Sequence, residues 1–220
     1  MAKRKVSNPL ALAVLGLLIE KPMHPYEMSS TMRERVKEES IKLNYGSLYS
    51  VVDSLLRHGL IEVQETVREG RRPERTVYAV TDLGRTEFVD WLSELVAVPV
   101  KEYTQFEAAL SLLPGLPPDE VVRLLMTRRM RLESEIIGTQ AVLDRMTDQG
   151  MYLMAIELDF LHELRKAELA FVERVIKQIQ NGTLGGLAFW RRAHEGGDLP
   201  TAEDWQRAEA ELRPRLDDIL

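Results

Sequence analysis

The chain has 220 residues, no cysteine, 29 basic and 35 acidic side chains, and a formal net charge of −6 with histidine neutral. Without cysteine it can form no disulfide, no thiolate nucleophile and no cysteine-ligated zinc site. The net acidity argues against a protein that coats nucleic acid or an anionic membrane, and 45% hydrophobic with 29% charged residues is typical of a folded chain of one large or two small domains.

The first segment joins three cations at residues 3–5 to an apolar run over residues 10–19. A secretory signal has this order, but here Glu20, Lys21 and Pro22 follow without a small-residue cleavage pattern. The run is also shorter than the roughly 20 apolar residues that cross a bilayer. We interpret it as a buried helix in a cytoplasmic protein that has no membrane partner.

Three helices are predicted before Gly59. Asn8 suits the N-cap of the first, a second begins near Pro25, and a third begins at Asn44. The third helix has an apolar face made of Leu48, Val51, Val52, Leu55 and Leu56. Its opposite face carries small and polar residues, namely Gly46, Ser50, Asp53, Ser54 and Arg57.

After this helix the apolar period changes from helical to alternating, which predicts strands over residues 60–67 and 76–80. Their connector, residues 68–75, contains glycine, proline and four arginines against two glutamates, and this indicates a basic hairpin loop. Thr81 then suits the cap of a further helix. That helix has large apolar residues at helical spacing: Phe88, Trp91, Leu92 and Leu95.

The helical pattern breaks around Pro99 and again at residues 113–119. Two long helices are predicted beyond the breaks, from about Asp119 to Met146 and from Met151 to Ile179. The second has two apolar rows, one of Leu153, Ile156, Phe160, Leu164, Ala167, Phe171, Val175 and Ile179, the other of Leu158, Leu161, Leu169, Val172 and Ile176. One partner helix would not cover both rows, so we expect a bundle shared between two chains.

These elements predict a mainly α protein in three parts. Three helices followed by a basic hairpin are the order of a winged helix-turn-helix, which we assign to residues 1–96 as a DNA-binding domain. Residues 97–181 form a dimerisation bundle of long helices, and residues 182–220 form a C-terminal extension with a short helix capped by Thr201.

The distribution of charge supports DNA binding. Residues 1–95 hold 14 basic and 14 acidic side chains, whereas residues 96–220 hold 15 and 21. Within the first part, positive charge gathers in the N-terminal arm and the wing loop, where a winged helix meets phosphates. The start of the third helix offers small, hydrogen-bonding residues to base edges. We expect DNA contacts from Lys3, Arg4, Lys5, Tyr26, Asn44, Tyr45, Gly46, Ser47, Tyr49, Ser50, Arg68, Arg71, Arg72 and Arg75.

Four motifs in this order also resemble a known family: Pro25-Tyr26-Glu27-Met28, Gly46-Ser47-Leu48-Tyr49, Leu55-Leu56-Arg57-His58-Gly59-Leu60-Ile61 and Tyr78-Ala79-Val80-Thr81-Asp82-Leu83-Gly84. They resemble the successive motifs of PadR-type transcriptional regulators, over about residues 8–95. The resemblance implies a homodimeric bacterial regulator, usually a repressor, that leaves its operator DNA when a small, often aromatic, effector binds. It implies DNA contacts from Ser47, Tyr49, Arg71 and Arg72.

A flat hydrophobic effector would bind beside aromatic side chains. Four are candidates, although each also suits a packing role: Trp91, Phe106, Phe189 and Trp190.

No catalytic site, metal site or cofactor is predicted. The histidines lie in separate segments without metal-binding spacing, which favours exposed or capping roles for His24, His58, His162 and His194. No phosphate-binding glycine loop or nucleophilic serine motif occurs. Two other hypotheses stay open, a winged-helix dimer that binds an acidic protein through its basic loop and an enzyme whose winged helix only dimerises. Duplex binding that weakens steeply with salt would distinguish the DNA regulator.

Overall fold

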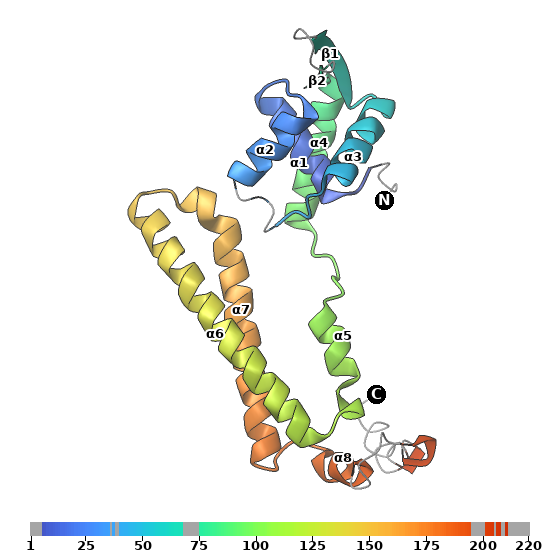
Figure 1. Ribbon diagram of the computed structural model, residues 1–220, viewed down its shortest axis with the longest axis vertical. Helices are drawn as coiled ribbons and strands as arrows, with labels where there is room; N and C mark the ends of the chain where they lie inside the picture. Colours follow the sequence, from blue (N-terminus) through green and yellow to red (C-terminus); the bar gives the residue numbers. More distant parts are fainter. Residues whose placement is uncertain are drawn as a thin grey trace. The chain divides into compact units, whose positions relative to one another are not determined.

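The computed structural model describes residues 6–35, 37, 40–67, 75–194, 201–204, 206–207 and 210 of the chain. The chain divides into two compact units, residues 1–101 and 102–220 (Figure 1). The predicted fold class, mainly helical with a winged-helix hairpin, is confirmed. No helix in the described ranges is long and apolar enough to cross a membrane.

The first unit contains the six elements predicted for it, three helices, two strands and the helix that follows them. They are α1 (Pro9–Glu20), α2 (Pro25–Glu34), α3 (Tyr45–Arg57), β1 (Ile61–Val67), β2 (Arg75–Val80) and α4 (Asp82–Ala97). The predicted N-caps are confirmed, because the side chains of Asn8, Asn44 and Thr81 accept hydrogen bonds from backbone N–H groups in the first turns of α1, α3 and α4.

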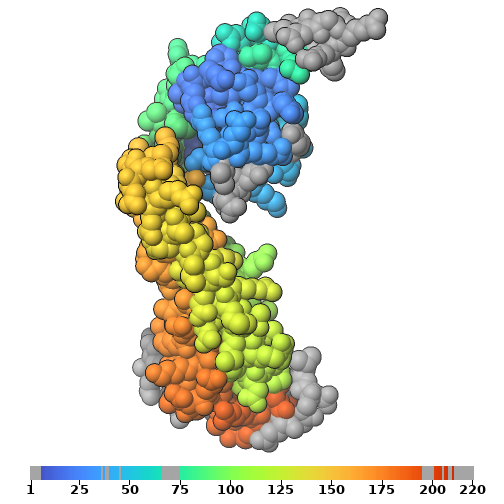
Figure 2. All heavy atoms as spheres, turned by 60° about the vertical axis from the view of Figure 1, so that its left-hand side comes forward, coloured from blue at the N-terminus to red at the C-terminus, as the bar shows by residue number. Residues whose placement is uncertain are grey.

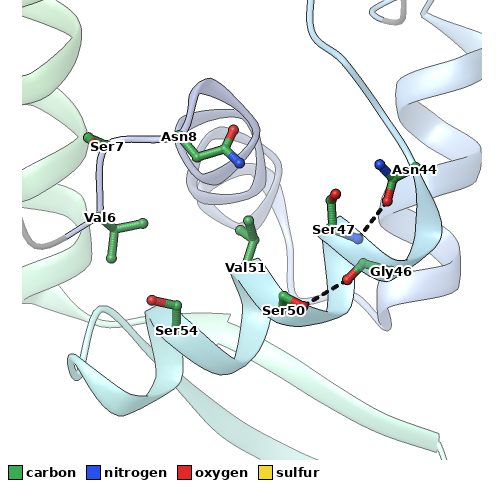
Figure 3. Close-up of a pocket in the computed structure, with 9 residues that line it drawn as sticks. All are labelled: Val6, Ser7, Asn8, Asn44, Gly46, Ser47, Ser50, Val51 and Ser54. Carbon is green, nitrogen blue, oxygen red and sulfur yellow. Dashed lines mark hydrogen bonds between the residues drawn. The ribbon is translucent and has the colours of Figure 1, made fainter.

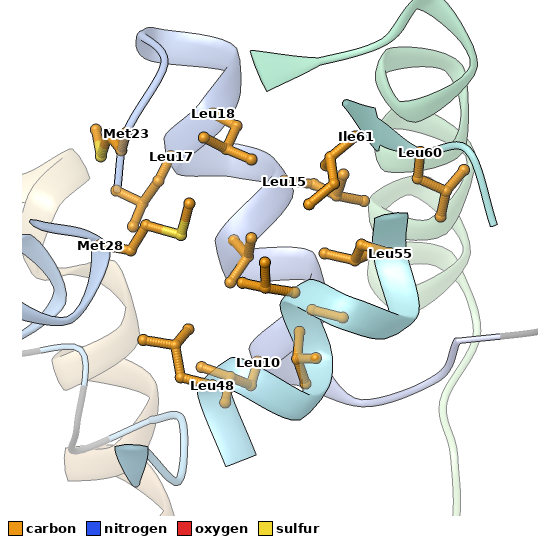
Figure 4. Packing of buried hydrophobic residues seen from close by; sticks show 14 of the residues in the cluster. Leu10, Leu15, Leu17, Leu18, Met23, Met28, Leu48, Leu55, Leu60 and Ile61 are labelled. Atoms are coloured by element: carbon orange, nitrogen blue, oxygen red, sulfur yellow. The ribbon is translucent and has the colours of Figure 1, made fainter. Parts of the chain in front are cut away.

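The core of this unit forms around α1. Leu10, Val14 and Leu15 of this helix are fully buried, because α1 is apolar on most sides and has neighbours on most sides. Leu48 and Leu55 of α3 pack into the same cluster (Figure 4). Burying one such leucine contributes about 2–3 kcal/mol. In α4, by contrast, the buried residues are only Gly84 and Trp91, while Leu92 and Leu95 are exposed.

The start of α4 is joined to the start of β1 through backbone contacts. The Thr81 N–H donates to the Leu60 carbonyl at 3.1 Å, and the Thr81 hydroxyl donates to the Gly59 carbonyl at 2.7 Å. A Cβ placed on Gly84 would lie 2.0 Å from the Leu60 carbonyl oxygen. Glycine at position 84 is therefore required by the close approach of helix to strand.

The wing is an antiparallel pair of strands in which Ile61 faces Val80 and Val67 faces Arg75. Tyr78 also pairs with Met23, in the turn between α1 and α2, through two backbone hydrogen bonds of 3.1 Å. The predicted hairpin is confirmed. Its pairing with Met23 joins the beginning of α2 to the base of the wing.

The second unit contains α5 (Gln105–Ser111), a 3₁₀ turn η2 (Leu113–Gly115), α6 (Pro118–Asp148), α7 (Tyr152–Gln180) and α8 (Leu187–Ala193). The two predicted long helices are confirmed as the antiparallel hairpin α6–α7, whose turn contains Gly150 at φ 69°. Helices α5 and α8 were not predicted from the sequence. Each has seven residues, which is too short for an apolar period to be recognised.

The core of the second unit lies at the end of the hairpin far from its turn. It contains Val121, Leu125, Leu132, Val172, Ile176, Ile179, Leu187 and Trp190. The indole N–H of Trp190 donates to the Leu116 carbonyl at 2.8 Å, which fixes α8 against the segment before α6.

The described histidines have different surroundings. His24 is an N-cap, His58 and His194 are C-caps, and the expected exposed or capping role is wrong for His162, which is 3% exposed. A ring nitrogen of His162, Nδ1, lies 2.8 Å from the Thr139 hydroxyl across the α6–α7 contact, so the buried imidazole has a polar partner. Among the described residues, no cluster of three or more potential ligands could hold a metal ion.

Candidate nucleic-acid interface

The beginning of α3 is a polar helix end that faces solvent. The Asn44 carboxamide oxygen accepts the backbone N–H of Ser47 at 2.7 Å, and the Ser50 hydroxyl donates to the Gly46 carbonyl at 2.9 Å. The Asn44 amide group is left to donate outward, since its oxygen is already engaged. The partial positive charge of a helix N-terminus adds to these donors.

An open hollow of about 580 Å³ lies between this helix end and the segment before α1 (Figure 3). Uncharged residues line it: Val6, Ser7, Asn8, Asn44, Gly46, Ser47, Ser50, Val51 and Ser54. Most of them carry a hydroxyl or a carboxamide. Such groups can both donate and accept hydrogen bonds, so the hollow suits a partner whose edge displays donors and acceptors in a pattern.

Gly46 lies on the exposed surface of the first turn of α3. A Cβ there would meet only the Asn44 carboxamide oxygen, at 3.8 Å, so packing inside the chain does not require glycine. A helix end without a side chain lets an external group approach the backbone closely. Gly46 thus differs from Gly84, where contacts within the fold explain the residue.

Tyr49 and Asp53 continue the exposed side of α3 towards the wing. Burial raises the pKa of the Tyr78 hydroxyl on β2, and the nearby Asp53 carboxylate and Tyr49 add to the effect. Helix α3 also contacts β1, the first strand of the wing. Helix α3 and the described part of the wing are therefore neighbours in the fold.

The first turn of α2 lies beside the same hairpin. The His24 ring accepts the backbone N–H of Tyr26 through Nδ1 at 3.0 Å, and the Tyr26 side chain is 62% exposed. Burial holds the pKa of His24 below its usual value, and the positive charge of Arg75, at the start of β2, lowers it further. Arg75 itself is exposed, as the first residue of β2.

This cap makes stability depend on pH. Because the folded-state pKa of His24 is lowered, the unfolded chain binds the proton more readily than the folded chain does. The contribution of neutral His24 to the free energy of unfolding is therefore fully present above about pH 6.5, and it is lost as the pH falls through the folded-state pKa. We expect the thermal midpoint to fall more steeply on acidification from about pH 7 to pH 5 in the natural chain than in His24→Asn. The asparagine keeps a capping oxygen and does not titrate, so equal slopes in the two proteins would contradict the assignment.

Several expected DNA contacts lie outside the described residues, namely Lys3, Arg4, Lys5, Arg68, Arg71 and Arg72. Of Tyr45 the backbone alone is described, as the first residue of α3. The structure brings Asn44, Gly46, Ser47 and Ser50 together around the hollow.

Three polar residues of the same hollow were not among the DNA contacts predicted from the sequence, nor were the two valines that line it. Ser7 and Asn8 precede α1, and Ser54 lies on α3. Asn8 carries a signal in the sequence only as a helix cap, and nothing local indicates that the beginning of α1 meets the beginning of α3. That proximity follows from the packing of the two helices.

The four aromatic effector candidates do not share one unit. Trp91 is buried in the core of the first unit, and Trp190 is buried in the core of the second. Phe106 and Phe189, also in the second unit, keep part of their surfaces open. The Arg128 guanidinium lies 3.6 Å from the centre of the Phe106 ring.

Comparisons with known proteins agree with this geometry. Residues 14–90 match the model of the transcriptional regulator PadR-like family. The negative transcriptional regulator PadR of Bacillus subtilis (strain 168) is 22% identical over 155 residues, which cover 70% of this chain and 84% of that protein.

Solved structures extend the likeness beyond the winged helix. Bacillus subtilis PadR in complex with operator DNA has a TM-score of 0.62 at 21% identity, covering 79% of this chain and 99% of that one. The same protein in complex with p-coumaric acid has a TM-score of 0.61 at 20% identity, covering 78% and 98%. The Vibrio cholerae virulence activator AphA has a TM-score of 0.57 at 15% identity, covering 78% and 98%.

At these identities the structural likeness establishes the fold, a winged helix followed by a helical unit. The family match runs from the middle of α1 into α4 and so includes α3 and the wing. The four motifs of the sequence lie within or beside the same range. Residues 14–90, from the middle of α1 into α4, are therefore similar to the PadR-like family of transcriptional regulators.

Proposed function

We propose that this chain is a member of the PadR-like family, a homodimeric repressor that binds operator DNA and leaves it when a small aromatic or hydrophobic effector binds. It acts in the cytoplasm, without catalytic activity or cofactor. Residues 1–96 bind DNA, residues 97–181 dimerise and residues 182–220 form an extension. The observation that carries the proposal is the uncharged polar hollow at the exposed N-terminal end of α3.

The roles of the residues follow from the chemistry of duplex DNA. Base edges in the major groove present donors and acceptors, which Asn44, Ser47 and Ser50 can match. Phosphates carry charge, which the cations of residues 3–5 and 68–75 can neutralise. Tyr26 and Tyr49 expose phenolic hydroxyls that can donate to phosphate oxygens.

The relatives support the partners that we propose. One solved relative is PadR in complex with operator DNA, another is PadR in complex with p-coumaric acid, and the curated relative is a negative regulator. For the effector we favour Phe106 and Phe189 over the two tryptophans, because both tryptophans are buried in cores. The homodimer is supported by exposed apolar residues on α7, which water does not favour.

Selection of bound fragments from random duplex DNA tests the function directly. A homodimer should enrich a palindrome whose half-sites are about one or two helical turns apart. Affinity for the enriched site should fall steeply with salt, because phosphate contacts release counterions. No enrichment, with binding indifferent to duplex and salt, would instead favour the acidic-protein partner.

Arg71→Ala combined with Arg72→Ala should weaken binding to every duplex, since phosphate contacts do not depend on sequence. The slope of log affinity against log salt should become shallower by about 0.9 for each phosphate that the variant no longer neutralises. Fluorescence anisotropy on operator and random duplexes, over a salt series, measures both effects. An unchanged slope would exclude the wing from the interface.

Ser47→Ala should change the preference among operator variants more than the affinity for random DNA. The hydroxyl lies at the hollow, whereas the backbone N–H of Ser47 makes the capping bond and survives the substitution. Leaving a buried base atom without its hydrogen-bond partner costs about 1–3 kcal/mol. Competition binding with single-base variants measures this cost, and equal losses on operator and random DNA would exclude base reading by Ser47.

A further inference from the structure

Two asparagines that cap helices lie on either side of the hollow at the beginning of α3. Asn8 caps α1 and Asn44 caps α3, and both line the hollow (Figure 3). Both side chains are exposed. Residues of the first part of the chain, blue in Figure 2, form much of the visible surface of the first unit. Asn8 therefore shares a solvent-facing hollow with α3, although it comes from a distant segment.

The capping bond fixes the orientation of the Asn8 carboxamide. Its oxygen accepts the backbone N–H of Leu10 at 2.9 Å. In a carboxamide only the oxygen can accept such a bond, so the nitrogen with its two N–H groups is the atom directed away from it. No hydrogen bond to another described residue engages this nitrogen. The Asn8 amide is thus a donor that is held in place and left open to an external partner.

The backbone at the beginning of α1 offers no competing donor. Pro9 has no N–H, the Leu10 N–H is bonded to the Asn8 side chain, and the Ala11 N–H donates to the Asn8 carbonyl at 2.7 Å. A partner at this end of the helix therefore meets side-chain donors. Of these, the Ser7 hydroxyl can rotate, whereas the capping bond orients the Asn8 amide.

The position of Asn8 favours a phosphate as the acceptor. The major groove of a duplex admits one helix, and α3 takes that place in the proposed function. A side chain at the beginning of a neighbouring helix then lies beside the groove, where the sugar-phosphate strand runs. The cations of residues 3–5, for which phosphate contacts are proposed above, come shortly before Asn8 in the chain. A phosphate oxygen only accepts hydrogen bonds, which suits a donor held in one orientation.

We propose that Asn8 donates its amide to a backbone phosphate beside the bases that α3 reads, and so positions α3 in the groove. The inference rests on the proposed DNA binding and adds a residue to it. Asn8 then has two roles, because its oxygen caps α1 while its nitrogen binds DNA. The contact does not depend on base sequence, and an uncharged amide neutralises no phosphate. It should therefore add affinity on every duplex and leave the dependence of affinity on salt unchanged.

Asn8→Asp and Asn8→Ser separate the two roles, since aspartate and serine cap helices about as well as asparagine but carry no amide. Both variants should keep the thermal midpoint of the natural chain within about 2 °C. Fluorescence anisotropy should show affinity lowered by about tenfold or more on operator and random duplexes alike. For Asn8→Ser the slope of log affinity against log salt should not change. For Asn8→Asp the loss should shrink as salt rises, because salt screens the repulsion between carboxylate and phosphate.

Two matched variants serve as controls. Asn44→Ser makes the same substitution at the cap of α3, and it should lower operator affinity more than affinity for random DNA, because α3 reads bases. Thr104→Asp adds the same charge at the cap of α5, in the second unit, and should leave both affinities unchanged.

Unchanged affinity in both Asn8→Asp and Asn8→Ser would overturn the inference. A loss confined to the operator would also overturn it, because Asn8 would then read a base. If only Asn8→Ala bound DNA weakly, the cap would be the sole role of Asn8, since alanine removes the capping oxygen as well as the amide. A natural chain that bound no duplex would refute the proposed function itself, and this inference with it.

Discussion

Replacing Gly84 with alanine is expected to destabilise the winged-helix unit by about 3 kcal/mol or more. The new methyl group would lie 2.0 Å from the Leu60 carbonyl oxygen, and that atom belongs to backbone that also accepts the Thr81 N–H. Relief requires α4 to move away from β1, which breaks the Thr81 bonds to Gly59 and Leu60. Calorimetry of the full chain should show the transition of this unit lowered by roughly 10–20 °C.

Gly138→Ala is the matched control. Gly138 lies within α6, and a Cβ there meets nothing within 4 Å. Alanine should therefore raise helix stability by about 0.5–1 kcal/mol, since it restricts the unfolded chain more than glycine does. If Gly84→Ala were as harmless as Gly138→Ala, the contact between α4 and β1 would be refuted.

Local chemistry accounts for what could be predicted in the winged-helix unit. Asn8, Asn44 and Thr81 have short polar side chains that suit N-caps, and each acts as a cap in the structure. The apolar face of α3 could be predicted because its spacing matches the helical period over about two turns. The wing could be predicted because apolar and polar residues alternate after Gly59 instead of following the helical period.

Features that depend on two distant segments could not be predicted. His162 is polar in the sequence, yet the contact between α6 and α7 buries it against Thr139. The hollow requires Ser7 and Asn8 to lie beside the beginning of α3, a contact that no pattern within either segment encodes. Phe160 fits a coiled-coil row in the sequence, and only the structure shows that its own chain leaves it exposed.

Phe160→Asp is expected to cause the other large effect, a loss of operator affinity of about 100-fold or more. The side chain is 67% exposed, so a carboxylate there should leave the folded protomer intact. In a dimer the same carboxylate would be buried against apolar residues, and an unpaired buried charge is strongly unfavourable. The protein should therefore sediment as a monomer, and each winged helix would then bind one half-site without the local concentration supplied by its partner.

Leu83→Asp makes the same kind of change at an exposed leucine of α4, which lies in the other unit. This control should remain a dimer. Because the half-site contacts of α3 are untouched, Phe160→Asp should keep the affinity of the natural chain for a single half-site while losing it for the palindrome. A monomer that still bound the palindrome tightly would break the link between dimerisation and operator binding. A variant that stayed dimeric would instead show that Phe160 lies outside the interface.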